Sequence, residues 1–361
     1  MAATFKTLNN NDITNTRTLL HESIPITGTI VSGTYGGATV ALGSEPNIKT
    51  YSHGMFESVY DYPYLSSSAN HIFDLTVGYS SDSVFSGSGT QNAKKINIYN
   101  QMAAVLMGHD VSGNIQKFDE DGDITGGGTK LESCMFVNFA RLLTKDEIKK
   151  GSFSLELGAS ASFDGALSDL SNGLITITDT NAANSFKVNS PTGEYGILYG
   201  TGSVMPASTP VGLLFYQAGV AVLTSSIWDT YGAGVNVATP MIMSGATTLT
   251  NFLTGATIDA AADYAFRHRL YNLSFNNTTE LNSTIYFCRA GNSEFNYSSN
   301  PTYLSASKMR VKNTTTDDPV AYMTTVGLYS PDNELLAVAK LSEPLKKTPT
   351  NELTLRVRLD Y

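Results

Sequence analysis

The sequence predicts a mainly β protein, built from antiparallel sandwich or barrel-like domains with a few short helices. Apolar and polar residues alternate with a period of two near the C-terminus, where polar residues separate Leu353, Leu355, Val357 and Leu359. Short apolar runs rich in strand-forming residues recur along the chain, and Gly-rich turns separate them. These two observations favour a sandwich or barrel over a helical fold.

Nine apolar runs are predicted to be strands: 26–31, 72–79, 134–142, 152–157, 174–178, 195–199, 213–216, 220–224 and 284–288. The segment Gln217-Ala218-Gly219 is expected to close a hairpin between two of them. At the C-terminus, 320–329, 335–341 and 353–359 are expected to form a three-stranded meander. A turn at 330–334 joins its first two strands, and Pro344 and Pro349 mark a loop before the third.

Three short helices are expected. Residues 92–107 place Ile98, Met102 and Leu106 at helical spacing, and Gly108 follows as a terminator. The capping box at 144–147 predicts a short helix that Gly151 ends. A third helix is expected to start near Asp12 and to carry Leu19 and Leu20.

The chain is poor in charge. Charged residues make up 15 % of its 361 residues, and the formal net charge is −9. This acidic balance argues against non-specific nucleic-acid binding and against a polybasic membrane-surface role. The longest apolar stretch, 211–223, is too short to span a bilayer, and the polar residues 1–15 predict no secretory signal.

The few charges are unevenly spread. Residues 158–260 carry only seven of the 55 charged side chains. Because a free surface is about a quarter to a third charged, this segment is expected to be deeply buried or packed against neighbouring molecules. The composition therefore predicts an inserted β-rich domain at 158–260. Residues 1–157 and 261–361 are expected to form together a discontinuous main domain.

No catalytic constellation is found, so the chain is predicted not to be an enzyme and to need no cofactor. The five histidines lack zinc-site spacing, and no Gly-x-Ser-x-Gly elbow is present. Cys134 and Cys288 lie in apolar runs and are expected to be buried free thiols.

An acidic turn is the strongest metal-like motif. Asp119, Asp121 and Asp123 match the start of a calcium loop, but Ile124 takes the glycine position and Lys130 the final ligand position. A tight turn is the preferred interpretation and a weak calcium site the alternative, so no metal is predicted.

Tyrosines surround Pro63. Tyr60, Tyr62 and Tyr64 offer broad faces with hydroxyl groups, so they are candidates for stacking on carbohydrate or for contacting a protein. Packing between domains is the alternative.

The sequence also resembles a family of virion structural proteins from contractile-tailed (myovirus-type) phages of marine cyanobacteria. The resemblance lies in ordered segments on both flanks of the chain: Thr18-Leu19-Leu20-His21-Glu22-Ser23-Ile24-Pro25, Gly54-Met55-Phe56, Val59-Tyr60-Asp61-Tyr62-Pro63-Tyr64, Asn97-Ile98-Tyr99-Asn100-Gln101-Met102, 142–151, 295–301 and 327–340. It implies a component of the virion, made in the host bacterial cytoplasm, with no enzymatic residues to carry over.

The resemblance implies assembly contacts as the function. A tail or baseplate subunit is the first hypothesis, with other virion proteins and further copies of the chain as partners. A capsid decoration or vertex protein is the second, and a module that binds host-surface glycan is the third. The interface candidates are Tyr60, Tyr62, Tyr64, Leu213, Phe215, Val220, Val222, Trp228, Arg356 and Arg358.

Overall fold

The computed structural model describes residues 5–25, 46–87, 90–124, 128–143, 146–158, 174–202, 205–228, 266, 270–296, 304–305, 308–309 and 320–361. Its fold is mainly antiparallel β with few short helices, which confirms the predicted class. The chain forms two compact units. The terminal unit comprises Met1–Leu19 and Glu280–Tyr361, and the central unit comprises Leu20–Thr279.

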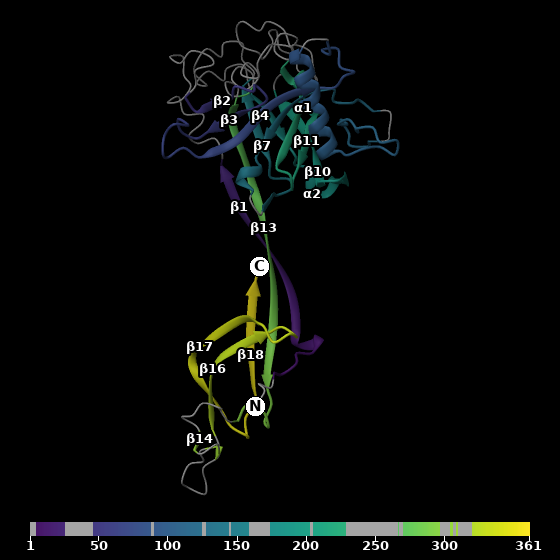
Figure 1. The fold of residues 1–361 in the computed structure, drawn as a ribbon. Helices are drawn as coiled ribbons and strands as arrows, with labels where there is room; N and C mark the ends of the chain where they lie inside the picture. Colours follow the sequence, from purple (N-terminus) through teal and green to yellow (C-terminus); the bar gives the residue numbers. More distant parts are fainter. Residues whose placement is uncertain are drawn as a thin grey trace. The chain divides into compact units, whose positions relative to one another are not determined.

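One large sheet forms the central unit, in the order β13, β7, β8, β10, β11, β12, β5, β4, β3, β2. Figure 1 labels β2, β3, β4, β7, β10 and β11 of this sheet. The bounds of these strands are β2 Ile48–Thr50, β3 Glu57–Tyr60, β4 His71–Tyr79, β5 Ser133–Asn138, β7 Ser154–Gly158, β8 Leu174–Thr178, β10 Gly193–Gly202, β11 Met205–Phe215, β12 Val220–Thr224 and β13 Leu270–Ala290. Short β6 (Asp146–Ile148) pairs with β13, and β9 (Lys187–Ser190) pairs with β10. The hairpin predicted at 217–219 is present between β11 and β12.

The middle of the sheet explains much of the charge-poor composition. All five residues of β12 are buried, and its neighbours β5 and β11 are largely buried too. A strand covered on both faces reads as a continuous apolar run instead of an alternating one. The described residues of 158–260 are therefore poor in charge mainly because they form the interior of their own sheet.

Helix α1 (Thr90–Leu106) covers one face of the sheet (Figure 1). Ile98, Tyr99 and Leu106 on it are buried, and the Tyr99 hydroxyl donates a hydrogen bond to the Leu131 carbonyl at 2.8 Å. Gly78 of β4 permits the close approach, because a Cβ there would lie 2.8 Å from the Lys95 carbonyl oxygen and the Tyr99 nitrogen. The predicted terminator Gly108 has φ of 81°, as a left-handed helix end requires.

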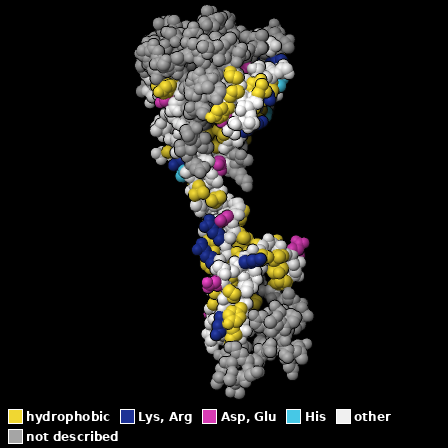
Figure 2. Space-filling model, turned by 90° about the vertical axis from the view of Figure 1, so that its left-hand side faces the viewer, with side chains coloured by type: hydrophobic (Ala, Val, Ile, Leu, Met, Phe, Trp, Pro, Cys, Tyr) yellow, Lys and Arg dark blue, Asp and Glu magenta, His cyan; other side chains and the backbone are white. Residues whose placement is uncertain are grey.

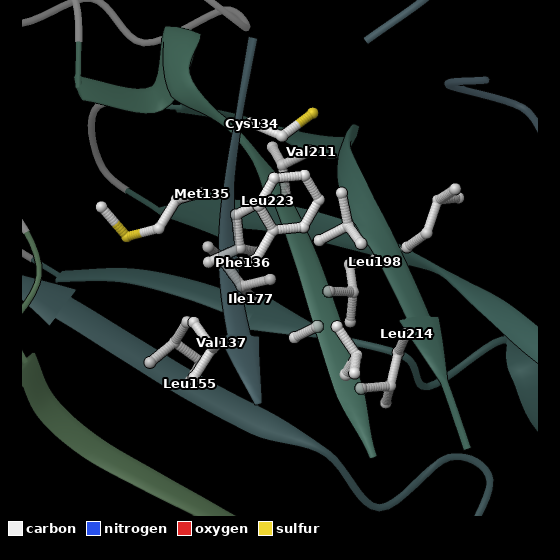
Figure 3. Close-up of a cluster of buried hydrophobic side chains, with 14 of the residues drawn as sticks. Cys134, Met135, Phe136, Val137, Leu155, Ile177, Leu198, Val211, Leu214 and Leu223 are labelled. Atoms are coloured by element: carbon white, nitrogen blue, oxygen red, sulfur yellow. The ribbon is translucent and has the colours of Figure 1, made fainter. Parts of the chain in front are cut away.

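Hydrophobic side chains pack on both faces of the sheet. Phe136 and Met135 of β5 point to opposite sides (Figure 3). On the α1 side, Phe118 contacts the rings of Tyr99 and Phe136 at centroid distances of 5.5 and 5.7 Å. On the other side, Phe139 contacts Phe275 at 5.4 Å. Aromatic pairs at these distances add to the stability that burial itself provides.

The terminal unit is also built from β-strands. Strand β18 (Leu353–Asp360) pairs with the second half of β13, from Ser283 to Ala290. Strand β1 (Ile13–Pro25) also pairs with β13. β16 (Ala321–Tyr329) and β17 (Leu335–Lys347) form a separate two-stranded sheet, and so do the two-residue strands β14 (Leu304–Ser305) and β15 (Lys308–Met309).

The C-terminal meander prediction is wrong in its last step. The hairpin of β16 and β17 forms with a turn at Ser330–Glu334, but the third strand pairs with β13 instead of β17. β17 also continues through Pro344 to Lys347, where a loop was predicted to have started. Proline is compatible with this position because the hairpin has an outer edge that needs no hydrogen-bond donor.

Two helix predictions are also wrong. A 3₁₀ turn at Asn10–Asp12 leads into β1, so Leu19 and Leu20 lie on a strand. Residues 146–148 form β6, because Glu147 pairs with Thr278 of β13 and this pairing outweighs the local capping signal. Among the described residues, further short helical turns lie at Ala140–Leu142, Ala182–Ser185 and Ser225–Trp228.

The compact units follow different boundaries from those expected near 158 and 260. β8 is hydrogen-bonded to β7, and β12 is hydrogen-bonded to β5, so described residues from 174 to 228 share one sheet with residues 133–158. The strand predicted at 26–31 lies outside the described residues. Both cysteines are free, with Cys134 buried and Cys288 half-buried.

Candidate functional site

A polar cluster on β3 and β4 is the arrangement closest to a catalytic site among the described residues. The His71 Nε2 donates to Asp74 Oδ1 at 2.6 Å, and the Ser58 hydroxyl donates to the same oxygen. Burial tends to raise the pKa of Asp74, but these hydrogen bonds and the charges of His71 and Arg141 hold it below its ordinary value. The cluster is thus built to keep an ionised carboxylate.

This cluster does not have the geometry of a hydrolase triad. In a triad the histidine stands between nucleophile and acid and accepts the proton of the serine. Here Asp74 stands between Ser58 and His71, so the serine hydroxyl is bonded to the carboxylate and not to the histidine. Asp74 also borders a groove of about 510 Å³ beside α1, whose other lining residues are mostly apolar, such as Met55, Met102 and Val105.

The tyrosines around Pro63 lie at the surface. Tyr62 and Tyr64 are each 37 % exposed, and Tyr60 is half-buried. The Tyr60 ring contacts Tyr64 at 6.3 Å and meets the His71 ring edge-on at 5.4 Å. A second aromatic group, formed by Tyr51, His53 and Phe56, lies in the preceding loop. These positions are compatible with a contact surface.

The three aspartates of the acidic turn do come together. One carboxylate oxygen each from Asp119, Asp121 and Asp123 lies within 4.8 Å of the others. Asp119 is fully buried and its carboxylate is bonded to the Lys130 ammonium. Burial acts to raise the pKa of Asp119, but hydrogen bonds from Asp121 and Lys130 lower it overall. Lys130 therefore supplies the positive charge that a calcium ion would bring.

We expect calcium to leave the stability of the protein unchanged. Lys130 neutralises Asp119, and the backbone amides of Asp121 and Asp123 already donate to aspartate oxygens at 3.1 Å. Melting curves recorded in millimolar calcium and in excess chelator should coincide. A melting temperature that rises by several degrees with calcium, and not with magnesium, would show that the turn binds the metal.

Five of the predicted interface residues are core residues of the central unit. Leu213, Phe215, Val220, Val222 and Trp228 are at most 6 % exposed. Phe215 stacks on Tyr195 at 5.0 Å, and Val222 lies opposite Phe136 on β5. Their side chains contact their own sheet, so they offer no surface to another molecule.

A buried aspartate, which the sequence analysis did not single out, holds three segments of the central unit together. Asp179 is fully buried after β8 and accepts hydrogen bonds from the amides of Gly151 and Phe153, at 2.8 and 2.9 Å. It also accepts one from the Tyr216 hydroxyl at 3.0 Å. Burial raises the pKa of Asp179, and these donors oppose the rise. Because Asp179 is enclosed by protein, it has a structural role.

The terminal unit exposes a row of large apolar side chains. We call Tyr322, Tyr329, Leu335, Leu336 and Val338 the hairpin stripe; they lie on β16 and β17 and are 43–67 % exposed. Hydrophobic side chains (yellow) are visible at the surface of this unit in the lower half of Figure 2. Large exposed apolar patches mark interaction sites in soluble proteins. The sequence predicted these strands, but not that their apolar side chains are exposed.

The two predicted arginines lie on the exposed face of β18. Arg358 donates to Asp360 at 2.6 Å and to the Ser283 hydroxyl at 3.0–3.2 Å. Arg356 lies opposite Phe287 on β13 and is exposed. Arg356 can therefore reach a carboxylate on another molecule.

Comparison with protein-family models, with curated proteins and with solved structures finds no match to this chain. Within the described residues, no helix has both the length and the hydropathy needed to cross a membrane.

Proposed function

We propose that the chain is a structural subunit of a tailed-phage virion, associated with the tail or baseplate, and that it acts through protein–protein contacts. The observation that carries the proposal is the hairpin stripe, a set of large apolar side chains that are 43–67 % exposed on a two-stranded sheet. An isolated two-stranded hairpin is marginally stable in water, so a surface of this kind is typical of a strand pair that another protein covers. The sequence resemblance to phage structural proteins supports the same function.

The polar groups of the described residues agree with a structural role. The Ser58 hydroxyl is buried and donates to Asp74, Asp179 is enclosed, and Asp119 is neutralised by Lys130. Each of these groups satisfies a neighbour within the fold instead of facing a substrate.

Immunogold labelling of the phage that encodes the chain tests this function. Antibodies raised against the purified protein should label the tail or baseplate of intact particles. Label on the head would favour the decoration or vertex alternative. Particles that carry no label, and whose protein gel lacks the chain, would refute a virion role.

Glycan binding is the second candidate, because Tyr62 and Tyr64 lie at the surface beside other aromatic rings. Stacking of sugar rings on such side chains would require both of them. Binding on a glycan array that is lost in the Tyr62→Ala/Tyr64→Ala variant would support this candidate, and an array without signal would argue against it.

A further inference from the structure

The described part of the terminal unit lacks a hydrophobic core of its own. Every member of the chain's buried hydrophobic cluster belongs to the central unit. Among the described residues of the terminal unit, the buried apolar ones are Ile285, Ala290, Ala321 and Val357. A β unit normally buries one hydrophobic face against another layer, and this unit does so only in part.

The packing inside the terminal unit is also open. A cavity of about 470 Å³ lies between β16 and the ends of β13 and β18, and Phe5, Tyr322 and Leu355 are among its lining residues. Lys347 is among the most buried residues of the unit. It donates to three oxygens, those of Asn292, Asn296 and Thr348. A charged side chain is thus buried in this unit, while Leu335, Leu336 and Val338 of the hairpin stripe are exposed.

The strands of the terminal unit have edges that no other described strand covers. Among the described strands β18 pairs only with β13, and β16 and β17 pair only with each other. β18 carries no proline, so its edge can pair with a further strand. Natural proteins normally cover such edges, or use them for association.

We propose that the terminal unit is a self-association module, in which the hairpin stripe of one copy packs against the terminal unit of a second copy of this chain. An interface that replaces a missing core resembles the interfaces of obligate homo-oligomers. A unit with so few buried apolar side chains needs its partner as soon as it is synthesised, and identical chains are always present at that moment. Most soluble oligomers are homo-oligomers.

The charges on the unit fit an identical partner. Arg356 is exposed on β18, and Asp332 and Glu334 are exposed at the turn of the hairpin. Among the described residues, neither Arg356 nor either of these carboxylates forms an ion pair. One copy therefore offers both a basic strand and an acidic turn, which can pair with the complementary groups of another copy.

Light scattering on the purified full-length protein tests the module. At micromolar concentration the wild-type protein should have the mass of a dimer or larger oligomer, built from chains of 38.7 kDa each. The double variant Leu336→Asp/Val338→Asp should weaken association about tenfold or more, because two charges enter an apolar interface. The matched control Val188→Asp changes a valine that is 69 % exposed on β9 of the central unit, and it should leave the mass unchanged.

A wild-type chain that is monomeric at tens of micromolar would overturn the proposal, and so would a double variant that associates like wild type. If the double variant does not fold, cross-linking of mixed ¹⁴N and ¹⁵N wild-type chains decides. Cross-links between copies should involve Lys340 or Lys346. Links that join only lysines of the central unit would refute the module.

This inference rests on the proposed assembly function, but the two fail in different ways. A chain that self-associates while antibodies find it in no particle would contradict the virion role alone. A chain found in particles but monomeric when pure would contradict the module alone.

Discussion

Replacing Asp179 by alanine should lower the free energy of unfolding by about 2–5 kcal/mol, because two buried amides and one buried hydroxyl lose their acceptor. The amides of Gly151 and Phe153 lie in the loop before β7, and the Tyr216 hydroxyl comes from the residue after β11. Asp179 thus fixes two connections of the sheet at once. Urea denaturation followed by circular dichroism measures the loss.

Two control variants define the role of Asp179. Asp179→Asn keeps the size of the side chain and one oxygen acceptor, so its loss should be smaller than that of Asp179→Ala. Asp82→Ala removes a 67 % exposed carboxylate that contacts Lys117, and it should leave stability nearly unchanged. An Asp179→Ala protein as stable as wild type would show that water replaces the carboxylate and that the three segments need no common acceptor.

Replacing Phe136 by alanine should cost about 3–5 kcal/mol, the range for large-to-small changes at buried aromatic residues. Phe136 is fully buried on β5, between β4 and β12, and its ring contacts Phe118 at 5.7 Å. The neighbouring strands are fixed by hydrogen bonds on both sides, so they cannot move in to fill the space. Guanidinium denaturation should show a lower midpoint with an unchanged slope.

Phe186 gives the matched control for Phe136. It is 37 % exposed, and its ring lies under the Lys150 ammonium at 4.8 Å. Phe186→Ala should therefore cost less than about 1 kcal/mol. If Phe136→Ala lowers the free energy of unfolding as little as Phe186→Ala does, the α1 side of the sheet repacks freely.

Local patterns were sufficient where an element is defined by its own residues. The helical spacing of Ile98, Met102 and Leu106 predicts α1, and its end at Gly108 follows from the left-handed conformation there. The apolar run at 220–224 predicts β12, and all five of its residues are buried. In both cases the local hydrophobic pattern agrees with the final packing.

Local patterns failed where a distant strand decides. The capping box near Glu147 favours a helix, yet pairing with Thr278 makes the segment a strand. The partner of β18 is β13, about 70 residues earlier, and no turn between them signals the pairing. The role of Asp179 likewise depends on Gly151 and Tyr216, which are far away in the sequence. Contacts between residues so far apart in the sequence cannot be predicted from local residue spacing.

The charge distribution illustrates the same limit for the candidate site. A scarcity of charge in 158–260 predicts buried surface, but it does not say whether the chain or a neighbour covers it. Within the described part of that segment, Phe215 and Val222 belong to the core of the central unit, whereas Phe186 and Val188 are 37 % and 69 % exposed. The hairpin stripe, whose apolar residues are exposed, lies instead in a segment with more ordinary charge.

The order of the strands along the chain has a consequence for synthesis. The strands in the middle of the large sheet, β5, β7, β8, β10, β11 and β12, all precede residue 225, so most of them are available before the C-terminal residues leave the ribosome. The first residues, by contrast, belong to the terminal unit, where Asp12 is paired with Arg289 and Asn15 contacts Thr284. Because the ribosome adds roughly 5–20 residues per second, β1 is synthesised tens of seconds before its partner strand β13. The apolar hairpin emerges later still, so the surface most prone to aggregation is exposed only when folding of the central unit is well advanced.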